Sequence, residues 1–212
     1  MEADRNFVDE STLRFIFDKC VNVVKFDETA FYRNRFNGFP GAKGVDIIAE
    51  SDESIQLIEI KDCLGYETEN IWRTSVDNSK LKSAPSGLPA DSSFDIEVVQ
   101  KVMATIACLY GAWSKSERMQ QSVVLSDFWK AFTNDKITKD KKKLRIVLFL
   151  EGDFYANGPK SRNKKMIMKR LQDSIKGHLS WLNCQVAVED SNTYAKQFFT
   201  VKRLAVPRQT KK

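Results

Sequence analysis

The chain has 212 residues, a length typical of one domain, and 42% of them are hydrophobic, which is enough for a packed core. Its formal net charge of +6 fits a polyanionic partner but does not require one. The sequence has no apolar run of about 18 residues and begins with a polar, acidic stretch, so neither a membrane span nor a signal peptide is expected.

The cysteine and histidine content limits the chemistry that the chain can perform. The cysteines are scattered without C-x-x-C spacing, so we expect reduced thiols and a cytoplasmic protein. His178 is the single histidine. A zinc site built on histidines is therefore excluded, as are most Ser-His and Cys-His catalytic arrangements.

The first elements of the chain are predicted from its apolar spacing. Residues 9–26 are predicted to form an amphipathic helix, because their apolar side chains recur at the spacing of one helical face. Residues 31–36 are predicted to form a short strand that ends in a turn rich in Gly and Pro. Arg33 and Arg35 on this strand either contact phosphate groups or form the exposed face of an edge strand. Lys43, which leads into the next segment, is a further candidate contact to nucleic acid.

Residues 44–62 are predicted to form a β-hairpin. Apolar and polar residues alternate on both sides of a polar, turn-rich tetrad at residues 51–54. A hairpin centred on this tetrad places Asp46 opposite Glu59, with Cβ atoms about 5 Å apart. Lys61 points to the same face, two residues beyond Glu59. The hairpin therefore brings two carboxylates and an ammonium group together at one end.

Two carboxylates at this distance repel each other, and partial burial strengthens the repulsion. Either Lys61 offsets the repulsion as a structural ion pair, or a divalent cation does so. A hard cation such as Mg²⁺ takes oxygen ligands, often one or two carboxylates with water and substrate phosphate. A neighbouring lysine then holds the attacking water, while the metal neutralises the charge that develops on a phosphodiester.

The D-x12-E-x-K arrangement on a hairpin resembles the active site of the PD-(D/E)xK, or restriction-endonuclease-like, nuclease superfamily. This resemblance implies that Asp46 and Glu59 bind Mg²⁺, for which Mn²⁺ can substitute, and that Lys61 positions the nucleophilic water. It also implies a metal contact from the backbone carbonyl of Ile60. The departure from the superfamily pattern is Val45, which stands where proline is often found.

Some members of the superfamily carry a further acidic metal ligand on the first helix. Glu10 is the nearest candidate in this chain. Its other interpretation is a carboxylate that complements the dipole at the helix N-terminus.

Residues 63–93 carry loop signals throughout and are rich in Ser, Asn, Asp, Gly and Pro. A loop of this length is usually functional or disordered, and this one follows the lysine strand directly, so it is placed to cover a nucleic-acid groove. Arg73, Lys80 and Lys82 suit that role, although ordinary solvation also explains them.

A long helix over residues 94–114 is predicted from one broad apolar face. That face comprises Ile96, Val99, Val102, Met103, Ile106, Leu109, Tyr110 and Trp113. Gln100 and Lys101 lie on this helix, which in the superfamily sometimes contributes a polar residue near the metal. A further helix is expected within residues 121–133. The apolar run at residues 144–152 indicates a buried central strand.

A basic amphipathic helix is predicted to follow Asn157-Gly158-Pro159 and to end near Leu182. Lys165 and Lys169 belong to its basic side, which is a phosphate-binding face, a membrane-surface face or a soluble face. Its low aromatic content argues against membrane insertion. Two late strands are predicted over residues 184–189 and 198–206.

The order of these elements predicts an α/β fold. It resembles the αβββαβ core of restriction-endonuclease-like nucleases, in which helices flank a mixed central sheet. We expect one domain over residues 1–206, with the core at residues 9–152 and a C-terminal α/β elaboration at residues 153–206. Residues 207–212 form a basic tail.

The resemblance implies a metal-dependent endo- or exodeoxyribonuclease that hydrolyses phosphodiester bonds in DNA, alone, as a homodimer or in a larger assembly. The alternative is a catalytically silent nucleic-acid-binding or assembly subunit with the same fold. A third interpretation is a surface salt-bridge ladder of Asp46, Glu59 and Lys61. Burial discriminates between the ladder and a catalytic site. A ladder is exposed on both flanks, whereas a catalytic site lies buried beside the second helix.

Overall fold

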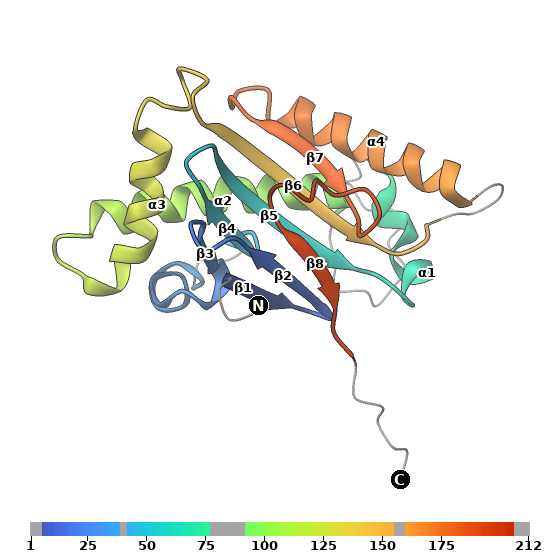
Figure 1. Cartoon of the computed structure of the whole chain (residues 1–212), viewed down its shortest axis with the longest axis horizontal. Coiled ribbons are helices and arrows are strands. Elements are labelled where there is room, and N and C mark those ends of the chain that lie inside the picture. Colours follow the sequence, from blue (N-terminus) through green and yellow to red (C-terminus); the bar gives the residue numbers. More distant parts are fainter. Residues whose placement is uncertain (1–5, 39–41, 77–91, 155–159, 206–212) are drawn as a thin grey trace, which may run out of the picture.

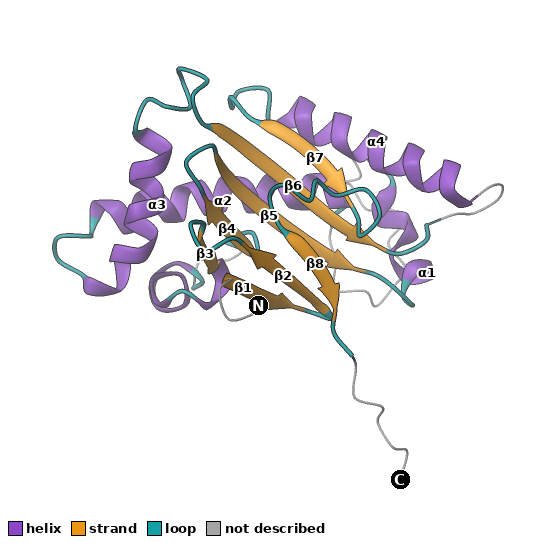
Figure 2. Ribbon diagram, viewed as in Figure 1, coloured by secondary structure: helices purple, strands orange, loops and turns teal. Residues whose placement is uncertain are grey.

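The computed structural model describes residues 6–38, 42–76, 92–154 and 160–205. These residues form an α/β fold in three layers (Figures 1 and 2). Helices cover one face of a five-stranded mixed sheet, and a three-stranded antiparallel sheet packs on its other face.

The five-stranded sheet has the order β3-β4-β5-β6-β7. Its strands are β3 (Asn22–Lys25), β4 (Ile47–Glu50), β5 (Ser54–Asp62), β6 (Lys143–Glu151) and β7 (Gln185–Glu189). The pairs β3–β4 and β4–β5 are antiparallel, whereas β5–β6 and β6–β7 are parallel. Eight of the nine residues of β6 are buried, because layers cover this strand on both faces. This confirms the buried central strand that the apolar run predicts.

The N-terminal prediction was wrong: residues 9–26 form strands and turns instead of a helix. The three-stranded sheet has the order β1-β2-β8, with β1 (Asn6–Glu10), β2 (Leu13–Phe17) and β8 (Thr200–Arg203). Leu13, Phe15 and Phe17 are fully buried, and their spacing of two residues is that of one face of a strand. The strand is favoured because β2 pairs with β1 on one edge and with β8, far away in the sequence, on the other. Helical periodicity within residues 9–26 does not detect these partners.

The predicted strand at residues 31–36 was also wrong. A 3-10 helix (Phe26–Glu28) is followed there by a π-helical segment (Tyr32–Phe36). The helical form brings the Tyr32 ring to 4.9 Å from the Phe26 ring and 6.2 Å from the Phe36 ring. Tyr32 also donates a hydrogen bond of 3.1 Å to the carbonyl of Ala42. These contacts bury the aromatic residues of the segment better than an edge strand does.

The three helices that the sequence predicts over residues 94–114, within residues 121–133 and after residue 159 are confirmed as α2, α3 and α4. The helices are α1 (Glu67–Asn70), a 3-10 helix (Ile71–Thr74), α2 (Phe94–Ser114), a 3-10 helix (Gln120–Ser122), α3 (Val123–Thr133) and α4 (Lys160–His178). Helix α2 packs between α3 and α4 on one face of the sheet (Figure 1). Residues 77–91, which include Lys80 and Lys82, lie outside the described residues, as does the tail at residues 207–212.

Helix α2 is rotated relative to the predicted apolar face. Met103, Tyr110 and Trp113 are exposed, whereas Lys101 and Thr105 are buried against the sheet. The prediction failed because α2 carries apolar residues on more than one side, so its spacing alone does not select the face that meets the sheet. In this orientation the polar residues Lys101 and Thr105 of α2 face the sheet.

The predicted late strands are confirmed as β7 and β8. Strand β7 pairs with β6 in the larger sheet, and β8 pairs with β2 in the smaller one. The segment that follows β6 is therefore built into both sheets.

Candidate active site

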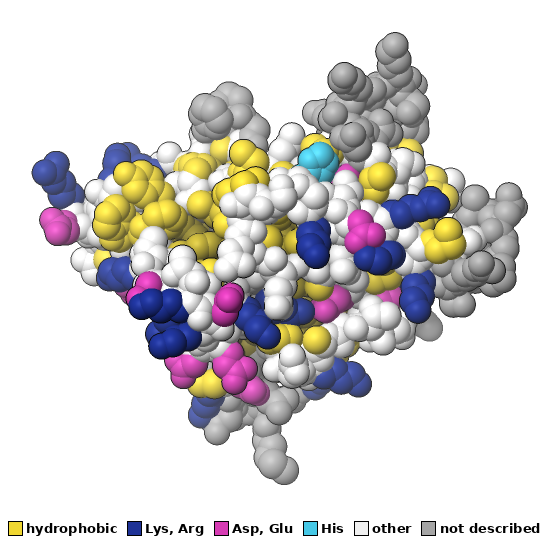
Figure 3. Space-filling view, turned by 90° about the horizontal axis from the view of Figure 1, so that it is seen from above, with side chains coloured by type: hydrophobic (Ala, Val, Ile, Leu, Met, Phe, Trp, Pro, Cys, Tyr) yellow, Lys and Arg dark blue, Asp and Glu magenta, His cyan; other side chains and the backbone are white. Residues whose placement is uncertain are grey.

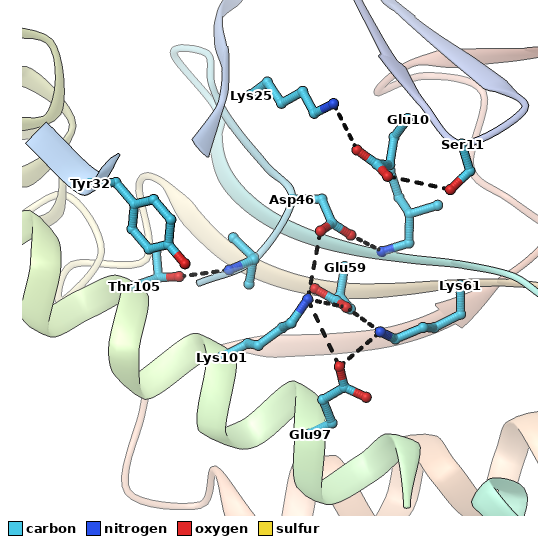
Figure 4. A network of polar contacts seen from close by, with 12 residues as sticks. Glu10, Ser11, Lys25, Tyr32, Asp46, Glu59, Lys61, Glu97, Lys101 and Thr105 are labelled. Carbon is cyan, nitrogen blue, oxygen red and sulfur yellow. Dashed lines mark hydrogen bonds and ion pairs between the residues drawn. The ribbon is translucent and has the colours of Figure 1, made fainter. Parts of the chain in front are cut away.

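Strands β4 and β5 form the hairpin in the predicted register, with Ile47 paired to Ile58. Asp46 directly precedes β4, and its backbone N–H donates a hydrogen bond of 3.1 Å to the Ile58 carbonyl. The side chains of Asp46, Glu59 and Lys61 converge on the helix-covered face of the sheet (Figure 4). The sequence alone therefore located this convergence.

Lys61 bridges two carboxylates from different elements. Its Nζ lies 2.9 Å from Oε1 of Glu59 on β5 and 2.8 Å from Oε1 of Glu97 on α2. The other oxygen of Glu97 accepts a short contact from the guanidinium of Arg73. Glu97 therefore holds Lys61 at the helix end of the site while Arg73 holds Glu97.

Lys101 lies between the two carboxylates of the hairpin (Figure 4). Its Nζ is 2.6 Å from Oε1 of Glu59, 3.6 Å from Oδ1 of Asp46 and 3.9 Å from Oε1 of Glu97. The charged cluster therefore contains three carboxylates and three cationic groups. Its members are Asp46, Glu59, Lys61, Arg73, Glu97 and Lys101.

Sequence reasoning missed Glu97 and did not assign a role to Lys101. The signal for both is their spacing: Glu97, Lys101 and Thr105 recur every four residues on one side of an otherwise apolar helix. Thr105 continues this side, and its hydroxyl accepts a hydrogen bond of 3.0 Å from the N–H of Val45. The bond ties α2 to the start of the hairpin.

The cluster is largely buried and does not lie on a solvent-exposed surface. The side chain of Glu59 is 1% exposed, and those of Asp46 and Lys61 are 16% and 17% exposed. An exposed ladder of charges is therefore contradicted by the burial. Such burial magnifies both the attraction and the repulsion between the charged groups.

The pKa shifts follow from burial and from the neighbouring charges. Burial, with the Glu59 carboxylate, raises the pKa of Asp46 to about 7. Burial disfavours the Lys61 ammonium, but Glu59 and Glu97 outweigh this effect and raise the pKa of Lys61 above its ordinary value. Burial likewise opposes ionisation of Glu97, yet Lys61 and Arg73 lower the pKa of that carboxyl.

The carboxylates of the hairpin are the candidate ligands for a divalent cation. Oε2 of Glu59 is buried and has no hydrogen-bond partner in the described part of the chain, so this carboxylate has an unused lone-pair site. Among the described residues, no group of three or more His, Cys, Asp and Glu side chains is arranged to hold a metal. A Mg²⁺ ion held by Asp46 and Glu59 would need water and substrate oxygens to complete its coordination.

Comparison with known proteins assigns the chain to a family. A protein-family model described as "Family of unknown function (DUF6661)" matches residues 29–203 of the chain. The chain belongs to this family. The matched range contains the whole charged cluster, while β1, β2 and β3 precede it. No curated protein and no solved structure matches the chain.

Within the described part of this DUF6661 protein, no helix is long and apolar enough to cross a membrane. The cytoplasmic location stays a prediction.

Glu10 and the backbone of Ile60 were also predicted to contact the metal, and the structure shows other contacts for both. Glu10 is at the end of β1, not on a helix, and its Oε2 is 3.0 Å from Nζ of Lys25 (Figure 4). Ile60 contacts Asp46 through its backbone N–H, which donates a hydrogen bond of 2.6 Å to Oδ2. A metal contact from the Ile60 carbonyl stays a prediction.

The predicted nucleic-acid contacts lie at opposite edges of the larger sheet. Arg33 and Arg35 are exposed on the π-helical segment, and Lys43 is exposed just before the hairpin. Lys165 and Lys169 are exposed on α4, which packs against β7. Edge strands β3 and β7 are four strand spacings apart, about 19 Å. The structure therefore does not bring these five side chains into one patch.

The charges on the surface of this DUF6661 protein are mixed. On the face shown in Figure 3, lysine and arginine side chains alternate with acidic ones and do not form one continuous basic field. On α4, Lys169 pairs with Asp173 at 2.5 Å, and Lys164 pairs with Asp190 at 2.6 Å. Part of the basic charge of α4 is therefore neutralised within the protein.

Proposed function

We propose that this protein is a metal-dependent nuclease that hydrolyses phosphodiester bonds in DNA. The observation that carries the proposal is the buried pair of Asp46 and Glu59 beside the ammonium of Lys61. Oε2 of Glu59 has no hydrogen-bond partner among the residues that the structure describes. A buried oxygen without a hydrogen-bond partner is costly, and clustered buried charges are frequent at functional sites.

The order of elements around the cluster supports the same proposal. Three antiparallel strands, β3, β4 and β5, are followed by the short helix α1, by α2 and α3, and then by β6, which is parallel to β5. This order is similar to the βββαβ part of the restriction-endonuclease-like core, with α3 as an additional helix before β6. Fold likeness alone does not give function, so the proposal depends on the site.

Each residue of the site has a role in this proposal. Asp46 and Glu59 would hold Mg²⁺ through their carboxylate oxygens. The bound ion supplies Lewis-acid stabilisation of the charge that develops on the phosphodiester. Lys61 stays protonated at neutral pH because its pKa is raised, so it orients the attacking water as a donor and does not remove its proton. Glu97 positions Lys61 by accepting its hydrogen bond of 2.8 Å.

The second candidate function is a catalytically silent nucleic-acid-binding or assembly subunit. The observation that favours it is the presence of three cationic groups beside the three carboxylates, an arrangement in which charge is compensated without any metal. Under this alternative, Lys101 is a permanent structural partner of Glu59.

The test measures cutting of supercoiled plasmid and of a single-stranded oligonucleotide with Mg²⁺, Mn²⁺ or chelator. Wild type is compared with Lys61→Ala and with Lys130→Ala, a variant of an exposed lysine on α3. Metal-dependent cutting that persists in Lys130→Ala and disappears in Lys61→Ala supports the nuclease. Equal cutting by Lys61→Ala and wild type rejects the assigned site. No cutting under any condition, with no metal binding, favours the silent subunit.

A further inference from the structure

Lys101 occupies the space between the two carboxylates that are proposed to hold the metal. Its Nζ contacts Oε1 of Glu59 at 2.6 Å and faces Oδ1 of Asp46 at 3.6 Å. We propose that Lys101 is an internal counter-ion of the metal site, which compensates the paired carboxylates in the metal-free protein and is displaced when a divalent cation binds. This inference rests on the proposed function, because it concerns the same site.

Competition follows from the chemistry of the ammonium group. A protonated lysine has three donors and no acceptor, so it cannot act as a metal ligand alongside the carboxylates. Its charge also repels a divalent cation that approaches the same oxygens, and the low exposure of Glu59 weakens the screening of that repulsion. Lys101 and the metal therefore cannot both contact Oε1 of Glu59 at low energetic cost.

The structure provides another carboxylate for the displaced lysine. Glu97 lies one helical turn before Lys101 on α2, and its Oε1 is 3.9 Å from Lys101 Nζ. A change of side-chain rotamer moves the ammonium from the hairpin towards Glu97 without moving the helix. The charge of Lys101 then remains paired while the hairpin carboxylates become free for the metal.

The consequence is that the wild-type site holds metal weakly and that removal of the Lys101 charge strengthens metal binding. Replacement by methionine keeps most of the side-chain volume and leaves the Glu59 carboxylate buried without its closest cation. The metal-free Lys101→Met protein should therefore unfold at a lower temperature than wild type. Metal should recover more stability in this variant than in wild type, because a ligand stabilises the state that it binds.

The experiment is calorimetric titration of metal alone, Mn²⁺ without DNA, into wild type, Lys101→Met and Lys101→Arg. Melting is recorded for each protein with chelator and with Mn²⁺. Lys101→Met should bind Mn²⁺ at least about tenfold more tightly than wild type, while Lys101→Arg, which retains the charge, should not. The double variant Glu59→Gln, Lys101→Met is the control, since it should lose the gain in affinity. Lys101→Gln replaces Lys101→Met if circular dichroism shows that the latter does not fold.

The outcomes separate this inference from the proposed function. Measurable binding to wild type with equal or weaker binding to Lys101→Met overturns the counter-ion role and leaves the metal site intact. No binding to wild type or to either uncharged variant overturns the metal site, and the nuclease proposal and this inference fall with it. Tighter binding to Lys101→Met that also persists in the double variant overturns the role of Glu59 as the shared ligand.

Discussion

The backbone N–H of Ile60 donates a hydrogen bond of 2.6 Å to Oδ2 of Asp46. This bond joins the residue before β4 to the middle of the candidate site on β5. It orients the Asp46 carboxylate so that its other oxygen, Oδ1, faces Lys101. A substitution at Asp46 can therefore change the charge of the site, the anchoring of the hairpin end, or both.

We expect Asp46→Asn to reduce metal-dependent cleavage at least about 100-fold while leaving the fold intact. The asparagine oxygen can still accept the hydrogen bond from Ile60, so only the charge is lost. Plasmid nicking rates and circular dichroism spectra, recorded beside wild type, check this. Asp46→Ala should lose the same activity and, because it also removes the acceptor, about 1–3 kcal/mol of stability. Wild-type cleavage in both variants contradicts the assignment of Asp46.

The raised pKa of Asp46 predicts a specific pH dependence of stability. The carboxyl titrates near 3.8 in the unfolded chain and at about 7 in the folded protein. Between these values the folded state binds a proton that the unfolded state lacks, so this contribution is complete below the lower pKa and is lost as the pH rises through 7. Three pKa units correspond to about 4 kcal/mol.

Asp46→Asn should remove this dependence. Relative to wild type, the variant should gain free energy of unfolding, by an amount on the order of 4 kcal/mol, as the pH rises from about 4 to 8. Urea unfolding of both proteins in chelator, at several pH values, measures the difference. A difference that stays constant across that range means that Asp46 is not protonated in the folded protein.

Gly44, just before the hairpin, should not tolerate a side chain. A Cβ at this position would overlap the ring of Phe26, which is fully buried. We expect Gly44→Ala to lower the free energy of unfolding by about 1–3 kcal/mol, because the ring or the hairpin must shift. Gly177→Ala is the matched control: apart from neighbouring residues of its own helix, no atom of the described residues lies within 4 Å of its added Cβ. This substitution near the end of α4 should be neutral or stabilising, by up to about 1 kcal/mol. Equal effects of the two substitutions contradict the overlap.

Lys165 and Lys169 should contribute phosphate contacts if DNA follows α4. Their joint replacement by alanine should weaken DNA binding and reduce the slope of log affinity against log salt by about 1 to 2. Fluorescence anisotropy in chelator, on an Asp46→Asn background, measures binding without cleavage. The control replaces Lys130 and Lys139, which pair with exposed carboxylates near α3. An unchanged slope in the first double variant, or an equal change in both, removes α4 from the binding surface.

The local pattern of apolar and polar residues was sufficient to predict those elements whose structure depends on neighbours in the sequence. The alternation in the hairpin specifies which side chains share a face, so the pairing of Ile47 with Ile58 and the convergence of Asp46, Glu59 and Lys61 were predictable. The apolar run of β6 and the long helix α2 were predictable for the same reason.

The tertiary structure decided the features that depend on distant partners. Residues 13–17 fit both periods, and they form β2 between β1, its neighbour in the sequence, and β8, which supplies a paired edge almost two hundred residues away. The apolar content of α2 is compatible with several rotations, and packing against the sheet, α3 and α4 selected the one that buries Lys101. The sequence by itself determined the three charged residues of the hairpin. Only the fold brought Glu97, Lys101 and Arg73 to them, because ion pairs between separate elements form when packing places those elements together.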